Sequence, residues 1–161
     1  MRVGFGYDIH PLKKGRRLTL GGQVINYYKG LKGHSDADVV IHALMDALLG
    51  AMGKGDIGLL FPPGEKEYMN ISSLILLNKI KENFLENNYS VLNIDITIVA
   101  ESPVLKDFYE IMKNNISRVL EIDCSKINVK ATTSEGLGPI GRKKGMEAYA
   151  VCMLKEKTTD E

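Results

Sequence analysis

The strongest constraint on the fold is residues 33–50, GHSDADVVIHALMDALLG, which join a polar start to an apolar body with helical spacing. Ser35 and Asp38 have the spacing of a capping box, so we predict a helix that begins near Ser35 and ends near residue 52. Asp38, His42 and Asp46 recur at every fourth residue and share one helix face, while the apolar residues between them can face a core. His34 precedes the helix start, where free N–H groups and the helix dipole favour an anion such as phosphate.

A second feature raises the possibility of a metal site. A lone histidine on an apolar helix is commonly a packed, hydrogen-bonded side chain, and this is the simpler interpretation of His42. However, residues 2–10 have the pattern of a strand that ends at Pro11, and in a strand Asp8 and His10 point the same way. Carboxylate oxygen and imidazole nitrogen both bind zinc. Glycines at positions 4 and 6 allow other backbone or a ligand to approach this strand closely.

The rest of the sequence is a succession of segments with strand or helix periodicity. It predicts a hairpin over residues 17–27 with a turn at Gly21-Gly22, helices near 71–86 and 104–120, strands near 92–98, 127–133 and 146–154, and a frayed tail at 155–161. Nothing in the 71–86 segment indicates chemistry. We therefore expect a two-layer α+β sandwich: a mixed four-stranded sheet with three helices on one face, plus the small N-terminal hairpin. The uncovered face of such a sheet favours an oligomer, and 161 residues suit a single domain spanning 1–161.

Two glycine-rich loops can carry chemistry. The segment GDIG at 55–58 can present a carboxylate and free N–H groups to a polyol, although a plain turn explains it equally well. Residues 132–142 combine hydroxyls, Glu135, glycines and Arg142, which suits a diphosphate with a magnesium ion. A structural glycine-rich loop is the alternative.

Composition excludes several classes of protein. The net charge of +1, spread along the chain, gives no basic surface for nucleic acid or an anionic membrane. No segment has the length and apolar character of a membrane span or a signal peptide. Cys124 and Cys152 match no metal or redox spacing and lie in apolar, strand-like surroundings, so we expect reduced core thiols in a cytoplasmic protein.

Six motifs, taken together, resemble the 2-C-methyl-D-erythritol 2,4-cyclodiphosphate synthase family. They are GYDIH (6–10), GHSDADV (33–39), HALMDALLG (42–50), GDIG (55–58), FP (61–62) and VKATT (129–133). Their order and spacing match the family over almost the whole chain. The resemblance implies a homotrimer with active sites at the subunit interfaces, in the non-mevalonate pathway of isoprenoid synthesis.

The reaction implied by this resemblance is a cyclisation. The 2-phosphate of 4-diphosphocytidyl-2-C-methyl-D-erythritol 2-phosphate attacks the β-phosphate, giving 2-C-methyl-D-erythritol 2,4-cyclodiphosphate and CMP. Because the attacking group is already an anion, no nucleophile or general base from the enzyme is required, and positioning and charge neutralisation are the main tasks.

The resemblance also implies roles for individual residues. Asp8, His10 and His42 would bind one Zn²⁺ per subunit, and Glu135 would bind a second divalent ion, Mg²⁺ or Mn²⁺, with the substrate. His34 and Thr133 would stabilise the transition state, and Asp46 would orient a zinc-bound histidine. The cytidine diphosphate substrate would be bound by Asp8, His10, His34, Ser35, Asp56, Ile57, Gly58, Phe61, Glu65, Ala100, Pro103, Thr132, Thr133, Ser134, Glu135 and Arg142, the Ala100–Pro103 segment acting largely through its backbone.

Three positions depart from the family pattern: Val104 replaces a common lysine, Glu65 a frequent aspartate, and Pro139 a frequent aromatic residue that lines a central cavity of the trimer. Two other functions are compatible with a zinc-binding trimer: a non-catalytic protein that binds isoprenoid diphosphates, and a zinc phosphodiesterase. Asp56 and residues 132–135 argue against a simple binder, since a central cavity does not need them. The lack of an obvious base to activate water argues against a hydrolase.

Overall fold

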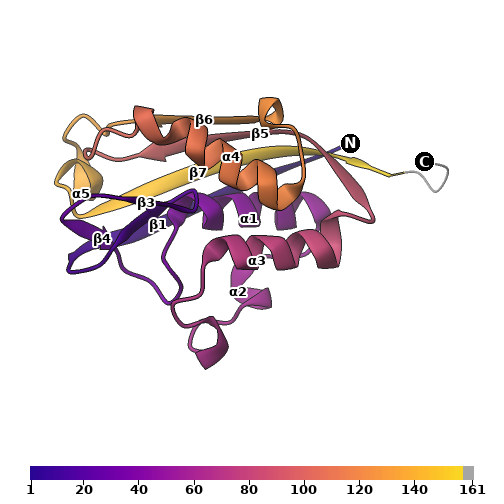
Figure 1. The fold of residues 1–161 in the computed structure, drawn as a ribbon, viewed down its shortest axis with the longest axis horizontal. Helices are drawn as coiled ribbons and strands as arrows, with labels where there is room; N and C mark the ends of the chain where they lie inside the picture. Colours follow the sequence, from indigo (N-terminus) through magenta and orange to yellow (C-terminus); the bar gives the residue numbers. More distant parts are fainter. Residues whose placement is uncertain (158–161) are drawn as a thin grey trace.

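A five-stranded mixed sheet forms the centre of the computed structural model, which describes residues 1–157 (Figure 1). Its strands lie in the order β4-β1-β7-β5-β6, and their bounds are β1 Arg2–Lys14, β4 Lys29–Leu31, β5 Tyr89–Val99, β6 Ile127–Thr132 and β7 Gly145–Glu156. Strands β5 and β6 are parallel, and the other neighbouring pairs are antiparallel. The α+β class and the mixed sheet are confirmed.

The expected number of four strands is wrong, and so is the expected end of the first strand at Pro11. Pro11 pairs with Gly145 at the start of β7, and from Leu12 onward β1 pairs with β4 instead. Although Pro11 has no N–H to donate, its carbonyl accepts a hydrogen bond from Lys32 N at 2.9 Å, so the ladder continues past it. Strand β4 has only three residues and no alternation, which leaves no signal in the sequence.

The N-terminal hairpin forms as predicted. Strands β2 (Leu18–Leu20) and β3 (Gln23–Ile25) make a separate two-stranded antiparallel sheet. Its turn is Gly21-Gly22, where φ is 57° and 73°, values that glycine adopts without steric cost.

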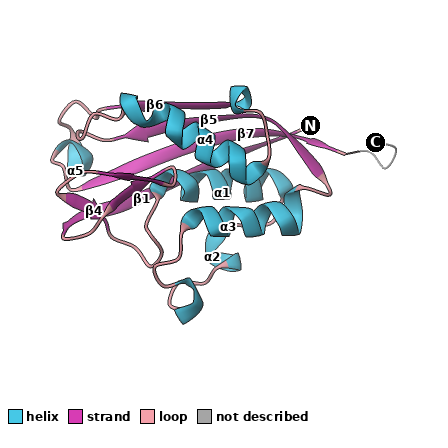
Figure 2. Cartoon of the chain, viewed as in Figure 1, coloured by secondary structure: helices cyan, strands magenta, loops and turns pink. Residues whose placement is uncertain are grey.

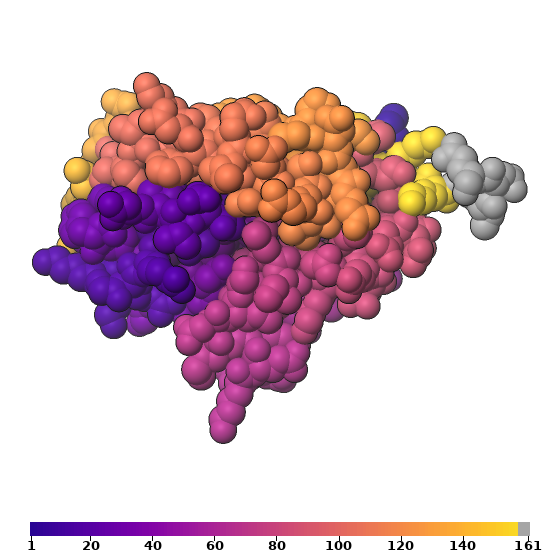
Figure 3. Space-filling model, viewed as in Figure 1, coloured from indigo at the N-terminus to yellow at the C-terminus, as the bar shows by residue number. Residues whose placement is uncertain are grey.

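The helices α1 (Val39–Met52), α3 (Ser73–Ile80) and α4 (Tyr109–Leu120) lie together in front of the sheet (Figures 1 and 2). A π-helical segment, η2 (Lys81–Leu85), continues α3, and a 3₁₀ turn, η3 (Lys106–Phe108), precedes α4, so the expected helical regions divide into different helix types. The predicted loops contain short helices: α2 (Ile57–Leu60), η1 (Lys66–Tyr68) and α5 (Gly138–Gly141). The segment with α2 and η1 projects from the body of the molecule (Figure 3).

Helix α1 begins at Val39, four residues later than expected, because Asp38 rather than Ser35 is the N-cap. The buried Asp38 carboxylate accepts hydrogen bonds from Val40 N and Ile41 N, and also from Gly21 N and Gly22 N in the hairpin turn. Burial and the nearby Asp36 raise the pKa of Asp38 to about 6 despite these donors. At the helix start, where free N–H groups were expected to attract an anion, the N–H groups of Val40 and Ile41 are therefore already occupied.

The C-terminal region differs from expectation at two points. Lys155 and Glu156 belong to β7, so the predicted fraying is wrong for them, while residues 158–161 lie outside the described part of the chain. Cys152 is a buried strand residue, as expected, but Cys124 opens a 3₁₀ turn, η4 (Cys124–Lys126), and is only half-buried. No helix among residues 1–157 is long and apolar enough to cross a membrane.

Candidate active site

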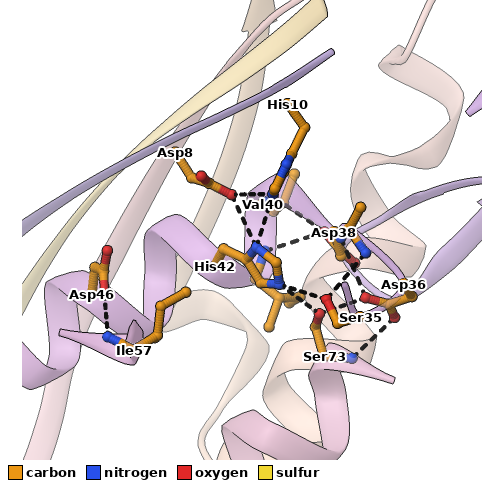
Figure 4. A network of polar contacts seen from close by, with 12 residues as sticks. Asp8, His10, Ser35, Asp36, Asp38, Val40, His42, Asp46, Ile57 and Ser73 are labelled. Atoms are coloured by element: carbon orange, nitrogen blue, oxygen red, sulfur yellow. Dashed lines mark hydrogen bonds and ion pairs between the residues drawn. The ribbon is translucent and has the colours of Figure 1, made fainter. Parts of the chain in front are cut away.

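Three predicted ligands, Asp8, His10 and His42, meet at one point between β1 and α1 (Figure 4). Asp8 Oδ2 lies 2.9 Å from His10 Nε2 and 3.0 Å from His42 Nδ1, and the two histidine nitrogens are 3.2 Å apart. Alternation along β1 directs both of its side chains toward α1, on the same face as Gly4 and Gly6. His42 lies one helical turn into α1 and reaches back to them.

This donor set fits zinc. Zinc takes carboxylate oxygen and imidazole nitrogen, and bonds of about 2.0–2.1 Å at tetrahedral angles separate two ligand atoms by about 3.3 Å. The three measured separations, 2.9, 3.0 and 3.2 Å, are close to that value. Three protein ligands also leave one corner of a tetrahedron for a substrate atom, which is the arrangement of a catalytic rather than a structural zinc site.

The charges of the three groups are strongly coupled. Burial alone would raise the pKa of Asp8, but hydrogen bonds from His10 and His42 outweigh it and hold that pKa well below its usual range. Burial opposes the charged form of His42, yet the Asp8 carboxylate raises the pKa of His42 overall. Asp8 is therefore an ionised carboxylate that favours a positively charged partner, either a protonated histidine or a bound cation.

The far side of the His42 ring faces two serines. His42 Nε2 is 3.0 Å from Ser35 Oγ and 3.0 Å from Ser73 Oγ, and Ser73 Oγ lies 2.5 Å from Asp36 Oδ1. The sequence indicated no chemistry in the segment that contains Ser73, because its partner Asp36 lies 37 residues away. The only available signal was a serine at the start of an amphipathic helix.

Asp46 does not have the expected contact. Its carboxylate accepts a hydrogen bond from Ile57 N at 2.9 Å, which ties α2 to α1, rather than bonding to a histidine (Figure 4). Burial raises the pKa of Asp46. The prediction that Asp46 orients a metal-binding histidine is therefore not supported by its hydrogen bonding.

A cavity of about 290 Å³ opens beside the donor cluster. Of the predicted site residues it contains Asp8, His10, His34, Ser35, His42, Ile57, Gly58 and Phe61. Asp56 does not line it, because its side chain caps α2 by accepting a hydrogen bond from Leu59 N at 3.0 Å. Glu65 is exposed and precedes η1 without a side-chain cap.

The other predicted residues form a second group at the ends of β5 and β6. Ala100 N bonds to Thr132 O at 3.0 Å, and Thr133 Oγ1 donates to Glu135 Oε1 at 2.7 Å. Ser134 lies in the same loop, Pro103 follows a cis peptide bond, and the exposed Arg142 ends α5. Thr132 lies on the face of the sheet opposite the core, whereas Asp8 and His10 point toward the helices.

Glu101 organises this second group, although the sequence analysis assigned it no role of its own. Its Oε1 accepts hydrogen bonds from Ser134 N at 2.8 Å, from Ser134 Oγ at 3.0 Å and from Gly136 N at 3.4 Å. These donors, the Ser134 N–H foremost, lower the pKa of Glu101. An acid directly after a buried strand was the signal that could have identified it. Within the described residues, no member of this group lines the cavity beside Asp8.

An α+β domain with an Asp-His-His cluster at the edge of a cavity has the arrangement typical of enzymes with a catalytic-type metal site. The chain belongs to the YgbB family, whose model matches residues 1–155. It is 53% identical over 156 residues to a 2-C-methyl-D-erythritol 2,4-cyclodiphosphate synthase from Desulforamulus reducens, covering 97% of this chain and 99% of that protein.

Solved structures agree with this assignment. The IspF–CDP complex of Plasmodium falciparum has a TM-score of 0.85 and 40% identity, covering 98% of this chain and 97% of that one. The bifunctional IspDF of Campylobacter jejuni has a TM-score of 0.92 and 45% identity over 97% of this chain. This chain spans only 42% of that longer protein.

Proposed function

We propose that this chain is a metal-dependent 2-C-methyl-D-erythritol 2,4-cyclodiphosphate synthase that releases CMP from 4-diphosphocytidyl-2-C-methyl-D-erythritol 2-phosphate. The observation that carries the proposal is the cluster of Asp8, His10 and His42 at the edge of a cavity, in a chain whose relatives bear that enzyme's name. The donor set suits zinc, with Mg²⁺ or Mn²⁺ at Glu135 as the second ion. Zinc would polarise the phosphate that undergoes attack.

The protein's own groups would bind and orient the substrate. His34 and Ser35 line the cavity beside the donor cluster, where an imidazole and a hydroxyl can donate hydrogen bonds to phosphate oxygens. Ile57, Gly58 and Phe61 give the same cavity a largely apolar wall that suits the methylerythritol carbon chain. Asp56 and Glu65 would contribute at the rim of that wall. No residue needs to remove a proton, because the attacking phosphate is already ionised.

The second group would bind the cytidine diphosphate part. Thr133 and Glu135 are already hydrogen-bonded to each other, so a hydroxyl and a carboxylate lie side by side for a diphosphate and its divalent ion. Thr132 at the end of β6 and Ser134 in the following loop add hydrogen-bond donors, and Arg142 at the end of α5 adds a cation. Ala100 and Pro103 would contact the cytosine through the backbone, and the IspF–CDP complex shows that a relative binds CDP.

A homotrimer with sites between subunits accounts for the separation of the two groups. The face of the sheet away from the helices exposes Val3, Phe5, Tyr7, Ile9 and Val151, and Phe5 is 62% exposed. An apolar strip on a sheet is typical of a protein interface. Assembly through it would bring the cavity of one subunit toward the loop at 133–137 of the next. We further propose that the chain acts as one domain over 1–161, in the cytoplasm, without nucleic acid or membrane partners.

Release of CMP by the purified protein with zinc and magnesium tests the reaction. Cyclic product together with CMP is the expected result. Absence of CMP would contradict both a synthase and a phosphodiesterase and favour a protein that only binds isoprenoid diphosphates. CMP with a linear product would favour the phosphodiesterase. Sedimentation of wild type and Phe5→Glu tests the assembly: the wild type should sediment as a trimer and the variant as a smaller species.

A further inference from the structure

We propose that Asp36 and Ser73 act as a pair that positions His42 as a metal ligand through its Nδ1 atom; this rests on the zinc site of the proposed function. The two ring nitrogens of His42 face different surroundings (Figure 4). Nδ1 faces Asp8 and His10, while Nε2 faces the hydroxyls of Ser35 and Ser73, each at 3.0 Å. A neutral histidine that binds a metal through Nδ1 carries its proton on Nε2, which then needs an acceptor.

Ser73 Oγ can be this acceptor because its own proton is donated to Asp36. The Asp36 carboxylate can only accept hydrogen bonds, and Ser73 Oγ lies 2.5 Å from Asp36 Oδ1, so the hydroxyl donates to Asp36. The lone pairs of Ser73 Oγ then face Nε2–H of His42. Ser73 is completely buried, so water cannot replace it in this contact.

Ser35 has a different role in this arrangement. Its Oγ accepts a hydrogen bond from Ala37 N at 3.2 Å, and no carboxylate among the described residues fixes the direction of its proton. Because Ser73 Oγ already accepts the hydrogen bond from His42 Nε2–H, the Ser35 hydroxyl can donate its own proton to another acceptor. Ser35 lines the cavity, where that acceptor can be a phosphate oxygen of the substrate.

The pair is held in place by backbone contacts between two distant segments. Ser73 N donates to Asp36 Oδ2 at 3.0 Å, and Asp36 N donates to Ile71 O at 3.0 Å. Ser72, the N-cap of α3, makes no side-chain cap hydrogen bond. The Asp36 carboxylate accepts the hydrogen bond from Ser73 N at the start of α3 instead. The alternative to our proposal is therefore a purely structural clamp between residues 34–36 and α3.

Zinc affinity distinguishes the two roles. In Ser73→Ala the backbone bond from residue 73 to Asp36 remains, whereas the hydroxyl's bond to Asp36 and its contact with His42 Nε2 are lost. We expect zinc affinity, measured by chelator competition at fixed pH, to fall 10- to 100-fold. In Asp36→Asn the amide no longer compels Ser73 to donate, so affinity should fall about 10-fold. Ser72→Ala, which removes the neighbouring hydroxyl, should leave affinity unchanged.

A spectroscopic measurement accompanies the affinity. In zinc-loaded protein with ¹⁵N-labelled histidine, the His42 Nε2–H signal should be protected from solvent exchange in wild type and in Ser72→Ala, and exchange faster in Ser73→Ala. Wild-type affinity and an unchanged signal in Ser73→Ala, with only a lower unfolding midpoint of the metal-free protein, would overturn the proposal. If Ser73→Ala does not fold, Asp36→Asn decides by the same two measurements. Neither readout requires turnover, so an absence of CMP release would count against the proposed reaction alone.

Discussion

Gly6 of β1 lies directly against Ala43 of α1: a Cβ atom added to Gly6 would be 1.9 Å from the Ala43 carbonyl oxygen. One helical turn further on, a Cβ at Gly4 would be 1.8 Å from the Ala47 carbonyl oxygen. The two glycines let the helix backbone rest on the strand backbone, which brings His42 within reach of Asp8 and His10. The close approach predicted from the glycines at 4 and 6 is thus confirmed, with helix backbone as the neighbour.

The first prediction follows from this contact. Gly6→Ala should lower the free energy of unfolding by about 2–4 kcal/mol, because the clash is with backbone that cannot rotate away. It should also weaken zinc binding by displacing α1 from β1. Urea unfolding of the metal-free protein and chelator competition measure the two effects.

Gly50→Ala is the matched control on the same helix. Its added Cβ would meet nothing nearer than Phe5 O at 4.0 Å, and alanine favours the helix over glycine by up to about 1 kcal/mol. We expect equal or greater stability and unchanged zinc affinity. Equal stability of Gly6→Ala and wild type would show that the strand and helix are not in this close contact.

Much of the fold could be predicted because its signals are local. Strand β5 alternates Ile94, Ile96 and Ile98 with polar residues, and these isoleucines are buried as expected. The hairpin turn at Gly21-Gly22 is likewise determined by two adjacent residues. Features that are determined by neighbouring residues can therefore be predicted from the sequence alone.

The errors arise where a distant contact decides between local alternatives. Ser35 and Asp38 both suit an N-cap. Asp38 is the cap in the structure, and its carboxylate also accepts hydrogen bonds from the N–H groups of the hairpin turn. The sequence analysis suggested Asp46 as the partner of His42, and nothing in the sequence pointed to Ser73. The packing of α3 against residues 34–36 brings Ser73 to His42. Spacing along a helix identifies which residues share a face, but not what lies opposite that face.

A second prediction separates metal binding from catalysis at two nearby histidines. His42→Ala should abolish stoichiometric zinc binding, since it removes one of three donors and leaves Asp8 and His10 alone. His34→Ala should retain zinc, because His34 is not in the donor cluster, but lower the rate of CMP release about 10²- to 10³-fold. Metal analysis after dialysis and the CMP assay give the two readouts. Stoichiometric zinc in His42→Ala would refute the ligand assignment.

A third prediction concerns Glu101, which holds the loop that carries Thr133 and Glu135. Glu101→Ala leaves the N–H groups of Ser134 and Gly136 without their acceptor, so the loop should lose its fixed position. We expect CMP release to fall at least about 10-fold with zinc affinity unchanged, because a misplaced binding group costs turnover while the donor cluster lies elsewhere.

Glu110→Ala provides the comparison for that variant. Glu110 is an exposed acid on α4 whose one ion pair within residues 1–157 is with Lys113, so its loss should leave both activity and zinc affinity at wild-type values. Glu101→Gln keeps one acceptor oxygen, so its rate of CMP release should lie between those of wild type and Glu101→Ala. Full activity in Glu101→Ala would show that the loop needs no such anchor.

The last prediction uses the buried thiol of Cys152. Burial raises the pKa of Cys152 from 9.0 to about 11. The folded protein therefore favours the neutral thiol, and this contribution to stability is fully present below about pH 9 and is lost as pH rises toward 11, where the unfolded chain ionises first. A shift of this size corresponds to about 2–3 kcal/mol.

Cys152→Ala should be less stable at pH 7 by about 1–2 kcal/mol, from the lost packing, yet lose less stability between pH 9 and 11. Urea unfolding of both proteins at these pH values measures the difference, to which the tyrosines and lysines common to both contribute equally. Parallel pH profiles would show that the thiol is accessible to water in the folded state.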